Sequence, residues 1–225
     1  MTFTILGHCP RTGLMGGAVT TSDVAVGARV LFAQAGLGVA ATQHRTDPRL
    51  GPALLAQLHA GDRAEQAVAT VVAATPDRAW RQLGVLDAGG RCAAYSGTRV
   101  WPVCAELPGD DCLVLGNMLA GPRVAAAMCE TFARRPADDL CGRLLAALDA
   151  GARAGGETGG GGLRSAALLV VDRESFPFVD LRIDDDPEPL RRLRALWETY
   201  RPLAVQFVAR ALTPDDVHRS SSTTT

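Results

Sequence analysis

Lysine is absent from this chain of 225 residues, so all 23 of its Lys/Arg positions are arginine. A chain without lysine cannot form a lysine Schiff base, use a lysine as a general base, or bind phosphate through the lysine of a Walker-type loop. Long apolar runs are also missing, because no stretch reaches the roughly 18 consecutive apolar residues typical of a membrane-spanning helix. We therefore expect no membrane-spanning segment and no lysine-dependent catalysis.

Paired cysteines and metal-binding patterns are lacking as well. The six cysteines include no Cys-x-x-Cys pair, and the four histidines show none of the spacings typical of zinc ligands. The first ten residues have neither a basic segment nor a long apolar run, so they do not resemble a signal peptide. These absences predict a cytoplasmic protein with reduced cysteines, no bound metal and no cofactor.

Charge of either sign is nearly balanced. The 23 arginines and 24 acidic residues give a formal net charge of −1. Because phosphate binding requires a basic surface, we expect no nucleic-acid partner. Nearly half of the residues, 47%, are apolar, which is typical of a globular chain with a buried core. A small molecule is therefore the expected substrate or ligand.

Strands and helices follow one another in groups. Short apolar runs bounded by turn residues predict strands over residues 2–9, 14–21, 24–32, 36–43, 82–87, 91–96, 112–116, 165–171 and 178–183. Leucine and alanine spacing predicts helices over residues 48–60, 62–74, 122–133, 137–154 and about 187–212. Grouped strands between helix pairs are not the strict β-α-β order of a parallel sheet. They indicate an α+β fold with antiparallel sheets and helices in separate layers.

No repeat or linker divides the chain. The glycine-rich stretch 155–162 is short enough for a loop, and it lacks the Gly-Lys-Ser/Thr ending of a phosphate-binding loop. Residues 1–212 are therefore predicted to form one domain, which includes the C-terminal helical segment at about 187–212. The low-complexity sequence at the C-terminus predicts a disordered tail over residues 213–225.

Thr2 is the first candidate for a catalytic residue. Removal of Met1 would leave Thr2 with a free α-amine. Because α-amines have a pKa of about 8, such a group acts as a base near neutral pH. One residue would then hold both a hydroxyl nucleophile and its base. The alternative is an ordinary threonine at the start of a strand.

Six short segments of the sequence are each unspecific, but their order along the chain is distinctive. They are TFTIL (2–6), TGLMGGA (12–18), AGLGVAATQ (35–43), RQLGVLD (81–87), GNMLAG (116–121) and SAALLV (165–170). Together they resemble domain-of-unknown-function family 1028, bacterial proteins grouped with the N-terminal-nucleophile (Ntn) hydrolases. The resemblance extends from Thr2 to roughly Leu193 and implies the four-layer αββα sandwich of antiparallel sheets found in Ntn enzymes.

The resemblance also implies roles by position in the fold. In proteasome β-subunits, which are related Ntn proteins, a basic side chain on the third strand lowers the pKa of the nucleophile. Arg29 is at about that place here, and an exposed strand arginine is the alternative. An acidic residue follows the second strand in those subunits. This chain has Ser22 and Asp23 there, and either would orient the α-amine.

Oxyanion donors in such a site are main-chain N–H groups and a nearby amide or hydroxyl. The end of the fourth predicted strand, Thr42 and Gln43, corresponds by position. Gly116 and Asn117 are predicted to open a helix, whose free N–H groups favour an anion. Asn117 is therefore the preferred side-chain donor, with a helix-capping asparagine as the alternative.

Three further residues are candidates for the same site. Glu157 and Ser165 resemble the acid and the serine that support the nucleophile ahead of a late strand. A solvated glutamate in the glycine-rich loop is the alternative for Glu157. His44, directly after Gln43, is either a pocket-lining residue or a surface histidine.

These assignments favour an amidohydrolase that cleaves a small amide or a related acyl bond. Thr2 Oγ would attack the acyl carbon and form an acyl-enzyme ester that water resolves. A non-catalytic small-molecule-binding or assembly module with the same fold is the alternative, because a fold alone does not prove a function. We also expect a homo-oligomer, with a dimer as the simplest state.

Overall fold

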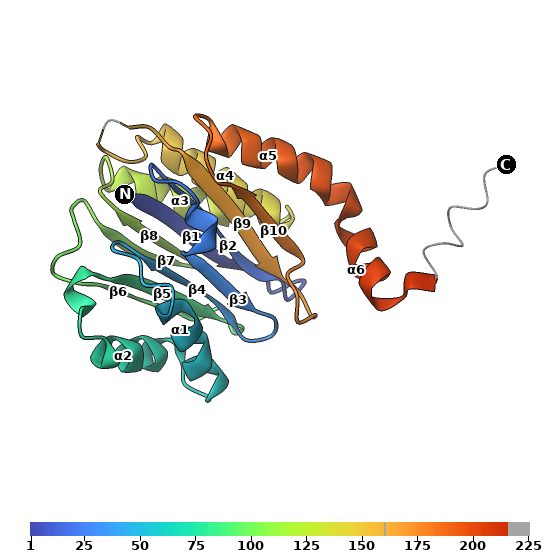
Figure 1. Cartoon of the computed structure of the whole chain (residues 1–225), viewed down its shortest axis with the longest axis horizontal. Coiled ribbons are helices and arrows are strands. Elements are labelled where there is room, and N and C mark those ends of the chain that lie inside the picture. Colours follow the sequence, from blue (N-terminus) through green and yellow to red (C-terminus); the bar gives the residue numbers. More distant parts are fainter. Residues whose placement is uncertain (160, 216–225) are drawn as a thin grey trace.

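The chain folds into two β-sheets flanked by helices (Figure 1). The computed structural model describes residues 1–159 and 161–215. The larger sheet has six strands in the order β10-β9-β2-β1-β8-β7. In chain order these strands are β1 (Thr2–His8), β2 (Met15–Thr21), β7 (Ala105–Gly109), β8 (Cys112–Asn117), β9 (Ser165–Val171) and β10 (Val179–Ile183). The β1 strand thus lies inside the sheet, paired with β2 on one side and β8 on the other.

The smaller sheet has four strands in the order β3-β4-β5-β6. These are β3 (Leu31–Gln34), β4 (Gly38–Gln43), β5 (Gln82–Asp87) and β6 (Cys92–Ser96). The helices are α1 (Leu50–His59), α2 (Ala64–Ala74), α3 (Arg123–Ala133), α4 (Leu140–Arg153), α5 (Pro189–Tyr200) and α6 (Ala204–Leu212), with 3₁₀ turns η1 (Val26–Ala28), η2 (Arg78–Trp80) and η3 (Arg201–Leu203). Neighbouring strands in both sheets run antiparallel, which confirms the predicted α+β class.

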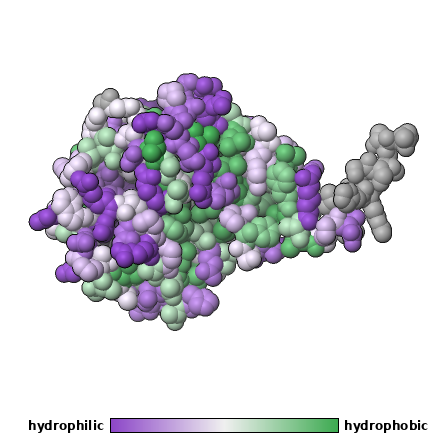
Figure 2. Space-filling view, viewed as in Figure 1, coloured by the Kyte–Doolittle hydropathy of each residue, from purple (hydrophilic) through white to green (hydrophobic). Residues whose placement is uncertain are grey.

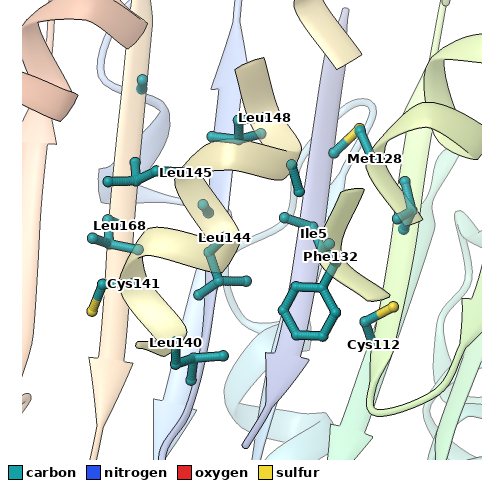
Figure 3. Packing of buried hydrophobic residues seen from close by; sticks show 14 of the residues in the cluster. Ile5, Cys112, Met128, Phe132, Leu140, Cys141, Leu144, Leu145, Leu148 and Leu168 are labelled. Carbon is teal, nitrogen blue, oxygen red and sulfur yellow. The ribbon is translucent and has the colours of Figure 1, made fainter. Parts of the chain in front are cut away.

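Buried apolar residues form three clusters. The first packs α3, α4 and α5 on one face of the six-stranded sheet, where Figure 3 shows Leu144 and Phe132 beside Ile5 of β1. The second cluster, which includes Leu6 and Leu86, lies between the two sheets. The third packs α1 and α2 on the other face of the four-stranded sheet. Both faces of each sheet are therefore covered.

The two faces of β1 differ in chemistry, because successive side chains of a strand point to opposite sides. Phe3 and Ile5 pack against the helices α3 and α4. Leu6 packs in the cluster between the sheets, and the alternation places Thr2 and Thr4 on the same face. The beginning of β1 therefore brings two hydroxyl groups into the space between the sheets.

Two segments differ from the sequence-based expectation. Residues 24–32, predicted to be a strand, contain η1 and reach β3 only at Leu31. Ala25 has a left-handed backbone with φ 52°, and its N–H donates to the carbonyl oxygen of Asp184 at 2.8 Å, outside any sheet ladder. The β7 strand was not predicted, because it lacks β-branched residues and contains Pro108. An edge strand tolerates such a proline.

The C-terminal segment is helical from Pro189 to Leu212, apart from the η3 turn. Leu193 and Trp197 of α5 join the core, whereas α6 extends away from the body (Figure 1) and buries only Ala204. Figure 2 shows apolar surface in this part of the molecule, and Phe207 of α6 is partly exposed. No helix in residues 1–159 and 161–215 has the length and apolar character needed to cross a bilayer. The predicted disordered tail lies, from residue 216 on, outside the described residues.

Replacing Leu144 by alanine tests the packing of α4 on the larger sheet. Leu144 is fully buried beside Gly7 of β1, so we expect the free energy of unfolding to fall by about 2–5 kcal/mol. Leu212→Ala, at a side chain that is 52% exposed, should change it by no more than about 0.5 kcal/mol. Urea unfolding followed by circular dichroism measures both, and equal losses would contradict the packing described here.

Candidate functional site

A cavity of about 280 Å³ lies at the N-terminal end of β1. Its walls come from separate segments of the chain and consist of Met1, Thr2, Thr21, Asp23, Arg29, His44, Arg45, Thr46 and Trp101. Four residues selected from the sequence therefore lie around one space: Thr2, Asp23, Arg29 and His44. Within residues 1–159 and 161–215, no three histidine, cysteine, aspartate or glutamate side chains gather closely enough to hold a metal ion.

Thr2 lines this cavity but is only 8% exposed. Its Oγ1 donates to the carbonyl oxygen of Met1 at 2.6 Å and lies 3.3 Å from Oγ1 of Thr21. The hydroxyl of Thr21 donates to the same carbonyl oxygen. While Met1 is present, its main chain therefore engages both hydroxyl groups.

Buried polar side chains connect the two sheets beside Thr2. Thr4 Oγ1 of β1 donates to Gln43 Oε1 of β4 at 2.6 Å. Gln43 Nε2 in turn donates to Oε1 of Gln82 at 2.6 Å, and Asn117 Nδ2 of β8 donates to the same oxygen at 3.0 Å. All four side chains have no exposed surface. Such groups are stable in a core only when they are hydrogen-bonded, and these bond one another.

Main-chain carbonyl groups fix the orientation of the Gln82 amide. Gln82 Nε2 lies 2.9 Å from the carbonyl oxygen of Gly116 and 3.2 Å from that of Ala105. Because a carbonyl oxygen only accepts, Gln82 must turn its NH₂ toward β7 and β8 and its oxygen toward Gln43 and Asn117. The NH₂ of Asn117 is thereby committed to Gln82. Its Oδ1 is buried and has no partner among the described residues.

The predicted setting of Asn117 is wrong, because it ends β8 and does not open a helix. The α3 helix begins at Arg123, after a turn in which Met118 has φ 53°. Asn117 therefore gains nothing from the helix dipole. It does pair directly with Thr2 in the sheet register. Directly paired residues of antiparallel strands face the same side, so the two side chains are neighbours.

Gln43, Thr42 and Gly116 have different surroundings. Gln43 belongs to the polar chain between the sheets. The hydroxyl of Thr42 instead donates to the carbonyl oxygen of Asp47 at 3.2 Å, so the structure does not bring it to Thr2. Gly116 contributes its carbonyl oxygen to Gln82, and a Cβ at this position would lie 2.7 Å from Leu119 Cδ1.

Arg29 lies at the end of η1 and not on the third strand, because that strand starts later than predicted. Its Nη1 donates to the carbonyl oxygens of Val24 at 2.6 Å and Ala25 at 2.8 Å. Its Nη2 is 3.4 Å from the carboxylate of Asp23. Ser165 holds the same loop, since its Oγ donates to the carbonyl oxygen of Asp23 at 2.7 Å. Arg29 thus brings a positive charge to the cavity on a loop that Ser165 positions.

Glu157 and Ser22 line a second cavity of about 170 Å³, which also borders Met1. The N–H of Ser22 donates to Glu157 Oε2 at 3.1 Å, and Oε1 is buried without a partner among the described residues. Burial raises the pKa of the Glu157 carboxyl to about 7, although the positive N-terminus nearby acts in the opposite direction. The alternative of a fully solvated loop glutamate is therefore wrong.

His44 supports a strained turn. His44 and Arg45 have φ values of 54° and 50°, and a left-handed non-glycine residue costs about 1–3 kcal/mol. The His44 Nδ1–H donates to the carbonyl oxygen of Trp80 at 2.8 Å, and Nε2 accepts from the N–H of Trp101 at 3.3 Å. Burial lowers the pKa of His44, which favours the neutral ring that these two bonds require. Both ring nitrogens are engaged, so His44 positions the turn.

Backbone strain concentrates at this end of the molecule. Five described non-glycine residues have left-handed backbones: Ala25, His44, Arg45, Asp111 and Met118. Asp111 lies beside His8 at the other end of β1, and the other four lie at this end. Ala25 binds Arg29, His44 and Arg45 line the cavity, and Met118 follows Asn117. Such strain persists where the surroundings enforce it, which occurs often at functional sites.

Sequence reasoning missed Thr21, Gln82, Arg45 and Trp101. A polar residue opening the otherwise apolar run 82–86 was a local signal for Gln82, and the register of β4 with β5 places it opposite Gln43. The hydrogen bond between Trp101 and His44 joins residues 57 positions apart. No local pattern connects such residues, because only the fold brings them together.

Comparison with known proteins identifies relatives of the chain. A family model described as "Family of unknown function (DUF1028)" matches residues 2–193. A crystal structure of a DUF1028 protein from Silicibacter pomeroyi is 36% identical, has a TM-score of 0.80, and the match covers 88% of each chain.

Two solved Anbu proteins are more distant. Anbu from Hyphomicrobium sp. strain MC1 is 13% identical with a TM-score of 0.40, over 91% of this chain and 97% of that one. Anbu from Yersinia bercovieri, described as an ancestral beta-subunit, is 12% identical with a TM-score of 0.41, over 92% and 96%. No curated protein matches.

Replacing Gln82 by methionine, which has a similar shape, tests the polar chain. The substitution leaves the NH₂ groups of Gln43 and Asn117 and the carbonyl oxygen of Gly116 without their partner. Because each orphaned buried group costs about 1–3 kcal/mol, we expect a loss of about 3 kcal/mol or more in urea unfolding. Gln206→Met on the exposed face of α6 is the matched control, and equal stability of the two variants would refute the network.

The raised pKa of Glu157 predicts a pH-dependent stability. Between about pH 4.5 and 7 the unfolded chain ionises this carboxyl while the folded chain keeps it protonated, so its contribution to stability falls as the pH rises. Glu157→Gln should match the parent below pH 4 and exceed it by on the order of 2–3 kcal/mol at pH 8. Urea unfolding across this range, with exposed Glu198→Gln as control, measures the difference. A constant difference at all pH values would contradict it.

Proposed function

The chain belongs to DUF1028, a family of unknown function, and we propose that it is an Ntn-type amidohydrolase that uses Thr2 after removal of Met1. One observation carries the proposal: the Thr2 hydroxyl lies in a cavity at the end of an inner strand, beside the hydroxyl of Thr21. We infer that the two antiparallel sheets, with helices on both outer faces, form the αββα sandwich of Ntn hydrolases.

Removal of Met1 would change the site in two ways. It would free the hydroxyl groups of Thr2 and Thr21 from the Met1 carbonyl and create an α-amine on Thr2. It would also join the two cavities, because Met1 lines both of them. The Met1 side chain lies close to Gly159, since a Cβ added to Gly159 would be 2.5 Å from Met1 Sδ. The joined space would have Thr2 between Arg29 and Glu157.

The proposed reaction has two steps. Thr2 Oγ attacks the acyl carbon of a small amide, and its proton passes to the α-amine of Thr2. The resulting ammonium gives this proton to the leaving nitrogen as the carbon–nitrogen bond breaks, which leaves an ester on Thr2. Water then attacks the ester with the α-amine as base. The carboxylic acid leaves, and the Thr2 hydroxyl is regenerated.

Neighbouring groups support a free amine at Thr2. Asn117 pairs with Thr2 in the sheet, and its unpartnered Oδ1 would accept a hydrogen bond from the amine. Glu157 and Ser22 border the position of the N-terminus, where the carboxyl would exchange protons with the amine. The charge of Arg29 favours the neutral, basic form of that amine. For Asn117 to act as the oxyanion donor of the sequence-based prediction, its NH₂ would have to leave Gln82.

A non-catalytic binding or assembly module is the second candidate. It is favoured by the hydrogen bond that commits the NH₂ of Asn117, the predicted oxyanion donor, to Gln82. A chain that keeps Met1 would have no free α-amine on Thr2 to act as its base. The homo-oligomer and the cytoplasmic location stay predictions.

Intact-mass measurement and substitution of Thr2 test the proposal. We expect the purified chain to lack Met1 and to hydrolyse members of a panel of small amides. Thr2→Ser should retain activity within about tenfold, because it keeps a hydroxyl and an α-amine. Thr2→Ala should lose at least about 1,000-fold in kcat/KM, since no nucleophile is left.

Arg173→Gln, at an exposed arginine on the β9–β10 turn, is the matched control and should leave activity unchanged. Retention of Met1 in the mature protein would rule out the α-amine as base. Full activity of Thr2→Ala would rule out the nucleophile.

A further inference from the structure

Arg45 lies on the wall of the cavity that contains Thr2. Its guanidinium carbon is 5.3 Å from the centre of the Trp101 ring and 5.8 Å from that of Trp80. Contact with two indole rings restricts a planar guanidinium without using its N–H groups. In the described part of the chain, no acceptor is hydrogen-bonded to the Arg45 side chain, whereas Arg29 bonds two carbonyl groups. The exposed Arg45 guanidinium therefore lies against the two rings with its donors free.

Charges on the cavity wall do not cancel. Among the described lining residues Asp23 is the one acid, and its carboxylate is already 3.4 Å from Arg29. Arg45 has no opposite charge of its own on this wall. Arg99, whose guanidinium carbon is 5.1 Å from the centre of the Trp80 ring, adds a further positive charge nearby. Asp77 also lies near Arg45, but its carboxylate is 3.9 Å from Arg81. The cavity mouth therefore attracts anions.

The backbone that carries Arg45 is strained and firmly held. His44 and Arg45 are consecutive residues with left-handed φ values, and the His44 ring is bonded to the main chain on both sides. The carbonyl oxygen of Arg45 accepts a hydrogen bond from Nη1 of Arg81. The turn therefore fixes where the Arg45 backbone lies relative to Thr2.

We propose that Arg45 binds a carboxylate, and that the substrate is a small amide bearing a carboxylate, of the N-acyl amino acid class. Arginine pairs with carboxylates through two parallel N–H···O bonds, which gives both orientation and affinity. With this group held at Arg45 beside Trp101, the amide bond would face Thr2 on the same cavity. A volume of about 280 Å³ is just below the range of ligand sites, roughly 300–1,000 Å³, so the cavity suits a small substrate.

The identity of the substrate rests on the proposed function, but binding of the carboxylate does not. The test therefore uses the Thr2→Ala variant, which binds without turnover. The probes are N-benzoylglycine and N-benzoylglycinamide, which differ only in a carboxylate against a neutral amide. Quenching of tryptophan fluorescence reports on their binding, since Trp80 and Trp101 flank Arg45.

N-benzoylglycine should bind at least about tenfold more tightly than the neutral probe, which is the effect of one charge-assisted pair. Arg45→Gln, made in the same background, should remove this preference without changing the affinity for the neutral probe. Arg173→Gln, at a side chain that is 86% exposed, should change neither affinity. In the Thr2→Ala variant with Arg45 intact, a higher salt concentration should weaken the binding of N-benzoylglycine but not that of the neutral probe. This comparison tests the role of charge even if Arg45→Gln fails to fold.

Equal affinity for the two probes, no binding of the acid, or a preference that survives Arg45→Gln would overturn the proposal. Selective binding of the acid in a protein that hydrolyses no amide would support this inference and reject only the amidohydrolase. Hydrolysis of neutral amides with no preference for the acid would leave the amidohydrolase standing and reject only the role of Arg45.

Discussion

The amide of Gln82 joins the two sheets at the end where Thr2 lies. Its NH₂ binds main-chain carbonyl groups of the larger sheet, and its oxygen accepts from Gln43 and Asn117. A shift of one residue in any participating strand would turn its polar side chain to the opposite face and leave several buried groups unpaired. The polar chain therefore fixes the register of β1, β4, β5 and β8 together.

Strained backbone and unpaired buried oxygens lie around this polar chain, at the end of the sheets where Thr2 is. The left-handed backbones of Ala25, His44, Arg45 and Met118 lie in loops around the cavity. Asn117 and Glu157 each have a buried oxygen without a partner among the described residues. A rigid base that carries strained turns and unpaired acceptors is the arrangement expected where a ligand or a new N-terminus completes the hydrogen bonding.

Much of the fold follows from local patterns in the sequence. The α+β class and most strands could be predicted, because short apolar runs and turn residues are local signals. The strand predicted over residues 24–32 was wrong, since the left-handed Ala25 interrupts a valine-containing run that is otherwise typical of a strand. Asn117 was selected for a helix terminus that does not exist, although its pairing with Thr2 brings it to the same place. Arg45 and Trp101 could not be found, because their proximity depends on tertiary structure alone.

The proposed reaction requires the hydroxyl of Thr2 to be an activated nucleophile. A β-lactone tests it most directly, because a nucleophilic hydroxyl opens the ring and keeps the acyl group as an ester. The purified protein would be incubated with the lactone, digested and mapped by peptide mass spectrometry. We expect one ester, on Thr2 at the N-terminus of the mature chain. An unlabelled Thr2 peptide that still begins with Met1, or a label found only on other residues, would contradict it.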